Sequence, residues 1–336
     1  YIHSVNCPSK ETEMAPPQQR RGTISSFRRQ KTSQWTRLVY HRIGVAQAAV
    51  FIFVIVITYH ALKQRAGRGA IVQELIRQVS QIEGSGPIVA HLSSLSKETT
   101  TSNARTTKDV RMRALKWIEV DTYGNQYREN ELVNLVQRYA LAVLYFSTGG
   151  DETWNKCSRD LRSPCDDGDK ESGITRFLSD TSSECRWYGV GCHENKIIWL
   201  DLTNINLHGT IMDELSLLPE LQSLWLSENR NLGGTLAESI GELKQLQSIS
   251  LFNTSIGGTI PERLFELGKL SSLRIYGSEF TGSIPSRVGE AKEMAWMWLH
   301  DNRLTGTIPR EIANLSKLEG LTIHGNDVRK TTQEID

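Results

Sequence analysis

A repeat of about 24 residues is the sequence feature that most limits how this chain can fold. Successive units begin at positions 197, 221, 246, 270 and 294, so the steps between them are 24, 25, 24 and 24 residues. A sixth unit begins at Leu318 and is incomplete. A fixed period of this length predicts a stack of similar units, each of which buries its apolar side against its neighbours.

The units share the frame L-x-x-L-x-L-x-x-N-x-L-x-G-x-I-P, which is a leucine-rich repeat, and the G-x-I-P extension resembles the plant-type subclass. The resemblance implies an α/β solenoid wound as a right-handed superhelix. The L-x-L part predicts a short strand that points its leucines into a shared core and alternate residues out of a concave sheet. The predicted core pairs are Leu224 and Leu226, Ile249 and Leu251, and Met297 and Leu299.

Polar residues and glycines recur at the turns after these strands. An asparagine there can satisfy backbone groups that leave the strand, as predicted for Asn229, Asn302 and Asn326. Three units depart from the rule, with Ile205, Thr254 and Ser278 at this place. The glycines that recur after the turn predict a tight bend, and they are Gly209, Gly234, Gly258, Gly282 and Gly306.

The segment before the first repeat, 110–196, resembles the capping region of plant-type leucine-rich-repeat ectodomains. The resemblance rests on a predicted helix at 128–146, Trp154 and the run CRWYGVGC from Cys185 to Cys192. Residues 138–154, with the apolar segment upstream, resemble the kinase-less leucine-rich-repeat proteins of diatoms. The resemblance implies a Cys185–Cys192 disulfide, with Trp187 and Val190 covering the first repeat.

Cys157 and Cys165 are the natural second pair, yet four cysteines allow three connectivities and the sequence does not choose among them. Zinc binding by these cysteines, with His193, is the alternative. An oxidising compartment argues against it.

Residues 43–62 predict a transmembrane helix, because these twenty residues contain no Lys, Arg, Asp or Glu. A buried β-strand is the alternative. The segment 1–42 holds eight Lys or Arg against two acids, which predicts a disordered cytoplasmic tail and repeats outside the cell, at the plasma membrane. The tail then sets topology or binds anionic lipid. A cleaved signal peptide is the competing interpretation, but a basic N-terminal segment of 42 residues is too long for the n-region of a signal peptide.

The predicted organisation has five parts. Tail and span are followed by a juxtamembrane helix and Ser/Thr-rich stalk at 63–109, the cap at 110–196, and five repeats plus a partial sixth at 197–336. Because the chain starts with Tyr1 and its sixth unit is unfinished, we expect further residues at one or both ends.

Known catalytic motifs and kinase signatures are absent from the sequence, which predicts a protein that is not an enzyme and needs no cofactor. Residues 165–171, CDDGDKE, lack the ligand spacing of a calcium loop, so we expect a surface loop and no metal site. Nucleic acid is not an expected partner.

Aromatic and charged residues collect on the predicted concave face, and this predicts a recognition surface for a peptide, glycan or protein. The resemblance adds a co-receptor as a further partner. A structural or adhesive scaffold and an unrecognised enzyme are the alternatives. For the aromatic residues themselves, the alternative is that the rings pack on one another or that a missing C-terminal region covers them. The candidate ligand-binding residues are Trp199, Asp201, Trp225, Phe252, Arg274, Tyr276, Trp296, Trp298, His300 and His324. Asn253 and Asn314 lie in sequons and are candidate glycosylation sites, although about two such matches are expected by chance.

Overall fold

The computed structural model describes residues 110–121, 133–160, 163–165 and 173–329, together with positions 73, 75–77, 79–81, 88–89 and 93. The predicted basic tail and membrane span, at 1–42 and 43–62, lie outside the described residues, as does the aspartate cluster at 166–169. Among the helices that are described, none is both long enough and apolar enough to cross a membrane. The span therefore stays a prediction.

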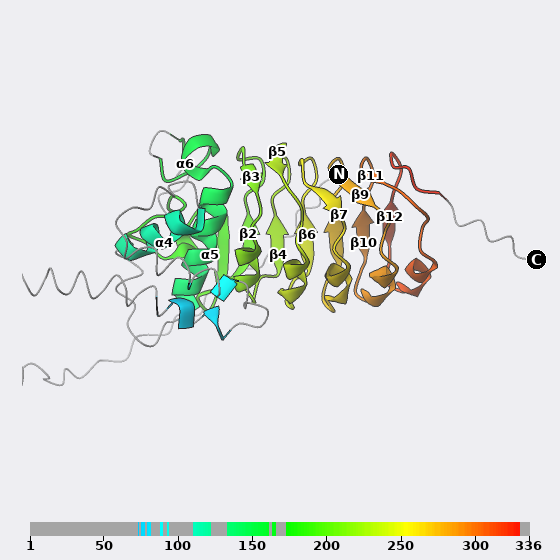
Figure 1. Cartoon of the computed structure of the whole chain (residues 1–336), viewed down its shortest axis with the longest axis horizontal. Coiled ribbons are helices and arrows are strands. Elements are labelled where there is room, and N and C mark those ends of the chain that lie inside the picture. The colour runs from blue at the N-terminus through cyan, green and yellow to red at the C-terminus, as the bar shows by residue number, and fades with distance from the viewer. Residues whose placement is uncertain are drawn as a thin grey trace, which may run out of the picture. The chain divides into compact units, whose positions relative to one another are not determined.

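Three helices precede the repeats, namely α4 (Val110–Val120), α5 (Val133–Ser147) and α6 (Gly150–Thr153) (Figure 1). Helix α5 falls on the predicted helix 128–146 and extends one residue past its end; its described part begins at Val133. Two residues after its end, Gly149 has a left-handed backbone, with φ 76°. Gly150 begins α6 and is buried.

Seven strands form one sheet in the order β1-β2-β4-β6-β8-β10-β12. Their bounds are Val190–His193, Lys196–Asp201, Ser223–Trp225, Ser248–Ser250, Ser272–Arg274, Trp296–Trp298 and Gly320–Thr322. Strand β1 is antiparallel to β2, and every later pair is parallel and joins equivalent residues of neighbouring repeats, such as Leu224 with Ile249. The repeats therefore stack one strand at a time, which gives a leucine-rich-repeat-like fold.

Each repeat continues into a second short strand and a 3-10 helix. The second strands are β3 (His208–Thr210), β5 (Asn231–Gly233), β7 (Gly257–Thr259), β9 (Glu279–Gly282) and β11 (Arg303–Leu304). They pair as β3-β5 and as β11-β9-β7. The 3-10 helices are η3 (Asp213–Leu217), η4 (Glu238–Glu242), η5 (Glu262–Glu266), η6 (Ser286–Glu290) and η7 (Arg310–Asn314), and η2 (Glu184–Arg186) lies in the cap. The repeat frame predicted the bend here but not this second row of strands.

The bend glycines have a steric reason. Each of the five predicted ones has a positive φ, between 74° and 112°. At Gly209, where φ is 112°, a Cβ atom would lie 2.1 Å from the carbonyl oxygen of Ser147 at the end of α5. The first bend therefore needs glycine both for its backbone conformation and for its close contact with the cap.

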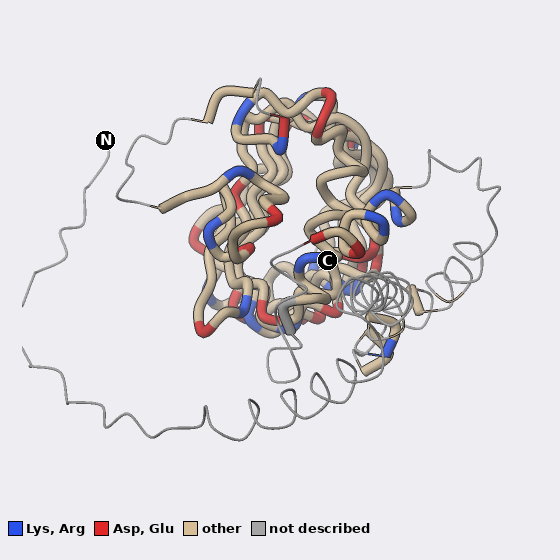
Figure 2. Tube along the Cα trace, turned by 90° about the vertical axis from the view of Figure 1, so that its left-hand side faces the viewer, with Lys and Arg blue, Asp and Glu red and all other residues tan. Residues whose placement is uncertain are grey.

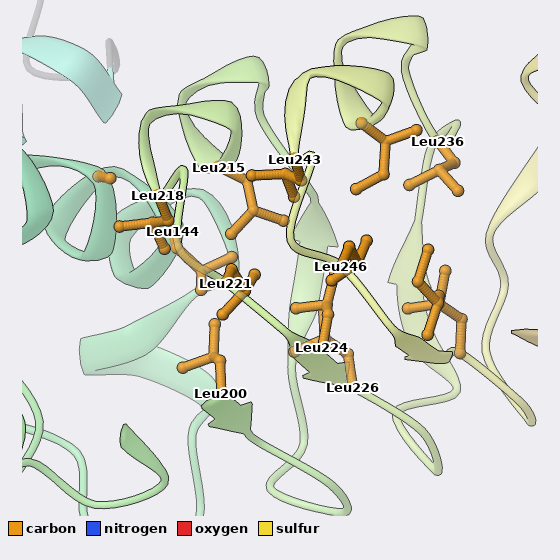
Figure 3. Close-up of a cluster of buried hydrophobic side chains, with 14 of the residues drawn as sticks. Leu144, Leu200, Leu215, Leu218, Leu221, Leu224, Leu226, Leu236, Leu243 and Leu246 are labelled. Carbon is orange, nitrogen blue, oxygen red and sulfur yellow. The ribbon is translucent and has the colours of Figure 1, made fainter. Parts of the chain in front are cut away.

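The core runs through all repeats between the sheet and the 3-10 helices. The predicted core residues Leu224, Ile249 and Met297 are fully buried, as are Leu226, Leu251 and Leu299. In the first layers, Leu144 of α5 lies beside Leu218 and Leu221 (Figure 3), so the cap and the repeats share one core. Leu75 and Val79, from the predicted juxtamembrane helix, are fully buried in the same cluster. In the view turned by 90°, Lys, Arg, Asp and Glu positions are distributed around the coils (Figure 2).

The turn asparagines make the predicted backbone contacts. Asn229 accepts hydrogen bonds from the Ile205 and Leu207 amides, at 3.1 and 3.0 Å. Asn302 likewise accepts from the Phe280 amide at 3.0 Å and donates to the Ile275 carbonyl at 2.8 Å. The amide side chain thereby ties each turn to the one before it.

In the departing units, Thr254 and Ser278 use hydroxyl groups instead, and both donate to the Leu251 carbonyl at 2.9 Å. Hydroxyl groups therefore replace the amide without loss of the turn.

Candidate functional site

The candidate ligand-binding residues all lie on or directly after the parallel strands of the main sheet. Trp199, Trp296 and His324 are exposed, and the other seven are half-buried. Four large hydrophobic side chains are exposed among the described residues, and two of them, Trp199 at 38% and Trp296 at 39%, belong to this set. We call these ten residues the sheet face.

Some outward positions of the same strands are buried, in contrast to the prediction. Ser227, Ser250 and Ser272 were expected to face solvent, but they are 1%, 6% and 8% exposed. The hydroxyls of Ser227 and Ser250 lie 2.8 Å apart and hydrogen-bond to each other. Strand alternation alone therefore overstates the exposure of small side chains on this face.

The first group on the sheet face is a tryptophan pair. The rings of Trp199 and Trp225 lie 5.8 Å apart at 80°, an edge-to-face contact. The indole nitrogen of Trp225 donates to the Ser248 hydroxyl at 3.2 Å. Asp201 lies next to this pair, but its carboxylate accepts from the Thr203 amide at 3.0 Å and so caps its own turn.

The second group is a column of stacked rings. Phe252 stacks on Tyr276 with ring centroids 4.6 Å apart, Tyr276 on His300 at 4.4 Å, and His300 on His324 at 4.7 Å. Each ring follows a strand of a successive repeat, so the stacking distances match the spacing of about 4.8 Å between strands. We call these four residues the ring column. Burial, and next the Glu228 carboxylate, raise the pKa of the Tyr276 phenol above its usual value.

Arg274 and two tryptophans lie beside the ring column. The Arg274 guanidinium carbon is 4.6 Å from the centre of the Trp298 ring, a cation–π contact. Trp296 meets Trp298 edge to face at 6.3 Å. Within the described part of the chain, the Nε atom of Arg274 and the hydroxyl of Ser272 are buried without a hydrogen-bond partner. The strand β8 thus presents polar groups whose hydrogen-bonding capacity is unused.

The Cys185–Cys192 disulfide that the resemblance implied is present, and the connectivity that the sequence left open is completed by a Cys157–Cys165 disulfide. Cys185 is bonded to Cys192 with Cα atoms 5.4 Å apart, and Cys157 to Cys165 with Cα atoms 4.3 Å apart. Trp187 is 1% exposed and Val190 8%, so both belong to the core that covers the first repeat.

The two sequon asparagines have different surroundings. Asn314 is exposed, whereas Asn253 is half-buried and its amide nitrogen donates to the Glu228 carboxylate at 2.9 Å. That nitrogen is the atom to which a glycan would be attached. Glycosylation stays a prediction at both positions.

A buried charge cluster in the cap was missed by the sequence analysis. Arg138 of α5 has no exposed surface and pairs with Asp121 at 2.5 Å and with Glu184 at 3.1 Å. Its guanidinium also lies 5.3 Å from the Trp117 ring and 4.7 Å from the Trp187 ring. Burial raises the pKa of Glu184, while Arg138 lowers it. The sequence signal that could have revealed this cluster was Arg138, an arginine in the middle of a largely apolar helix.

Comparison with known proteins gives short or partial matches. No family model matches the chain. Protein MALE DISCOVERER 1 of Arabidopsis thaliana is 47% identical over 53 residues, and MALE DISCOVERER 2 is 44% identical over 52 residues. Each match covers 16% of this chain and 8% of the relative, so the chain spans a small part of the curated proteins it matches.

Three solved structures match the chain over less than half of its length. A plant ice-binding protein has a TM-score of 0.44 and 31% identity, covering 45% of this chain and 50% of its own. The BIR3–SERK2 complex from Arabidopsis thaliana has a TM-score of 0.41 and 34% identity, and the match covers 45% of this chain and 81% of that chain. A third structure is the Arabidopsis receptor kinase HAESA in complex with the peptide hormone IDA and the co-receptor SERK1. It has a TM-score of 0.39 and 32% identity, and the match covers 43% of this chain and 25% of that chain.

Proposed function

We propose that this chain is a receptor-like recognition module whose sheet face binds a peptide, glycan or protein, with a co-receptor as a further partner. The observation that carries the proposal is the exposure of Trp199 and Trp296 on one face of the sheet. Exposed tryptophans offer a large contact area with little loss of side-chain entropy, and they are enriched where proteins bind their partners.

The polar groups of the sheet face support the same proposal. Arg274 lies against Trp298 and has an unused Nε donor, and Ser272 on the same strand has an unused hydroxyl. Buried donors without partners are costly, and a ligand that accepts hydrogen bonds would satisfy them. A ligand with both an apolar surface and an acceptor group fits this combination.

Binding of the full chain to a glycan array and to a peptide library would test the proposal. Trp296→Ala should weaken capture strongly, because Trp296 is exposed on the sheet face. Ile174→Ala is the matched control, since Ile174 is a large hydrophobic residue that is 49% exposed and lies outside the repeats. Equal capture by both variants and the unmodified chain would move the site off the sheet face.

A structural or adhesive scaffold is the second candidate function. Tyr276 stacks on Phe252 on one side and on His300 on the other, so part of the aromatic surface is used inside the protein. A scaffold needs rigid repeats but no ligand. Full-chain protein that captures nothing on either array, yet mediates clustering of coated beads, would favour this candidate.

We also propose that residues 43–62 anchor the chain as a single span, with 1–42 cytoplasmic and the repeats outside the cell. The unequal basic charge on the two sides of the segment supports this orientation. The two disulfides support an oxidising compartment for the cap and the repeats. Protease protection in sealed vesicles tests the topology, and digestion of the repeats from the cytoplasmic side would contradict it.

A further inference from the structure

The last two residues of the ring column differ chemically from the first two. His300 and His324 are imidazoles, whereas Phe252 and Tyr276 cannot act as neutral nitrogen ligands. The carboxylate of Asp301 lies beside them, and the potential ligand atoms of these three residues all lie within 4.8 Å of one another. No other group of three or more potential metal ligands occurs in the described part of the chain.

The geometry points to a binding site for a divalent transition metal ion, formed by His300, Asp301 and His324. Two imidazoles and one carboxylate suit zinc and its neighbours better than calcium or magnesium, which prefer a shell of oxygen ligands. Three protein ligands also leave coordination positions open for water or for a group of a bound ligand. This site does not depend on the proposed recognition function.

The hydrogen bonding of His300 leaves one nitrogen for the metal. Its Nδ1 atom lies 2.8 Å from the Thr322 hydroxyl, on the neighbouring strand β12. In the tautomer in which Nδ1–H donates to Thr322, the lone pair of Nε2 is free to coordinate. A metal-binding histidine usually donates its second ring N–H to an oxygen in this manner, which fixes the ring and raises its basicity.

Asp301 is held close to His324 by the turn of the next repeat. Its backbone amide donates to the His324 carbonyl at 2.9 Å. Its carboxylate oxygen Oδ1 occupies the space beside Gly325, where a Cβ atom would lie only 2.1 Å away. Gly325 therefore leaves room for the Asp301 carboxylate next to the imidazole of His324.

The same arrangement occurs two repeats earlier without metal-binding groups. There, Asn253 places its amide oxygen beside Gly277, where a Cβ atom would lie 2.3 Å away, and the flanking rings are Phe252 and Tyr276. The backbone geometry is thus a property of the repeat. Only at His300, Asp301 and His324 does the chain fill all three places with metal ligands.

Metal binding requires one ring to turn. The rings of His300 and His324 are 19° from parallel, whereas a shared ion must lie near the plane of both rings. His324 is exposed, and rotation about the bond to a planar ring meets only low barriers. The ion would replace one ring contact with a nitrogen ligand bond.

Zinc titration of the full chain in detergent, without reductant, tests the site by calorimetry. His300→Phe and His324→Phe keep a ring in the column, as Phe252 does at its other end, and Asp301→Asn reproduces Asn253. Each variant should weaken zinc binding at least about tenfold, since even loss of an outer contact costs about 10- to 100-fold. Calcium should bind the unmodified chain and the variants alike.

His193→Phe and Asp327→Asn are the matched controls, because both residues are exposed and lie outside the cluster. They should keep the zinc affinity of the unmodified chain. Circular dichroism shows whether each variant is folded. If His300→Phe does not fold, the zinc affinity of His324→Phe tests the site. Unchanged zinc affinity in a folded variant of any of the three proposed ligands would overturn the site.

Discussion

The rings of Tyr276 and His300 are stacked with their centroids 4.4 Å apart and only 8° from parallel. The two residues are 24 positions apart in the sequence and lie side by side because each follows the equivalent strand of successive repeats. Tyr276 also stacks on Phe252 at 4.6 Å, which makes it the central ring of three.

Loss of the Tyr276 ring should therefore destabilise the repeats. Tyr276→Leu removes two stacking contacts, each worth about 0.5–1.5 kcal/mol, so we expect the free energy of unfolding to fall by about 1–3 kcal/mol. Tyr276→Phe keeps both contacts and should have little effect. Urea denaturation followed by circular dichroism measures both values, and equal stability of the two variants would show that the stack contributes nothing.

Arg138 should be among the most sensitive positions in the cap. Arg138→Met leaves the buried carboxylates of Asp121 and Glu184 without their cation, and loss of one partner of a buried ion pair costs about 3–5 kcal/mol. Arg274→Met is the matched control, because Arg274 also lies on a tryptophan ring but is half-buried and has no ion pair among the described residues. Similar losses of unfolding free energy in the two variants would contradict the prediction.

The Glu184 carboxyl should make stability depend on pH. Burial raises its pKa above the usual 4.5 in the folded protein, so the folded state binds a proton more tightly than the unfolded state. Its contribution to stability is then complete below the unfolded pKa and is lost as the pH rises through the folded pKa. Glu184→Gln should remove this decline.

Urea midpoints measured from pH ~4 to ~8 would check the sign. The difference in stability between the unmodified chain and Glu184→Gln should shift towards the variant as the pH rises. A difference that is constant with pH, or that shifts the other way, would show that Arg138 outweighs burial at this carboxyl.

The two disulfides should differ in their effect on stability. Their sequence separations are 7 and 8, so chain entropy predicts a similar contribution of about 2–3 kcal/mol for each. The Cys185–Cys192 bond should matter more, because Cys192 lies in β1, which pairs with the first repeat strand. Thermal denaturation of the Cys185→Ser/Cys192→Ser and Cys157→Ser/Cys165→Ser variants compares them, and an equal or larger loss in the second variant would refute this order.

The sequence alone determined the repeating part of the fold. The period of about 24 residues fixed where each strand begins, and leucine spacing fixed which large apolar side chains point into the core, because side-chain direction within a strand depends on local alternation. The same logic placed Trp199 and Trp296 on the outer face. These predictions needed only residues that are close in the sequence.

Tertiary structure decided what depends on contacts between distant residues. The sequence left the disulfide connectivity open, and it did not reveal that Arg138 would be paired with Asp121 and Glu184, which lie 17 residues before it and 46 after it. It placed Phe252, Tyr276, His300 and His324 on one face but not in one stack. Ring contacts and ion pairs arise only when the backbone brings side chains within a few ångströms, and the repeat period alone does not set their rotamers.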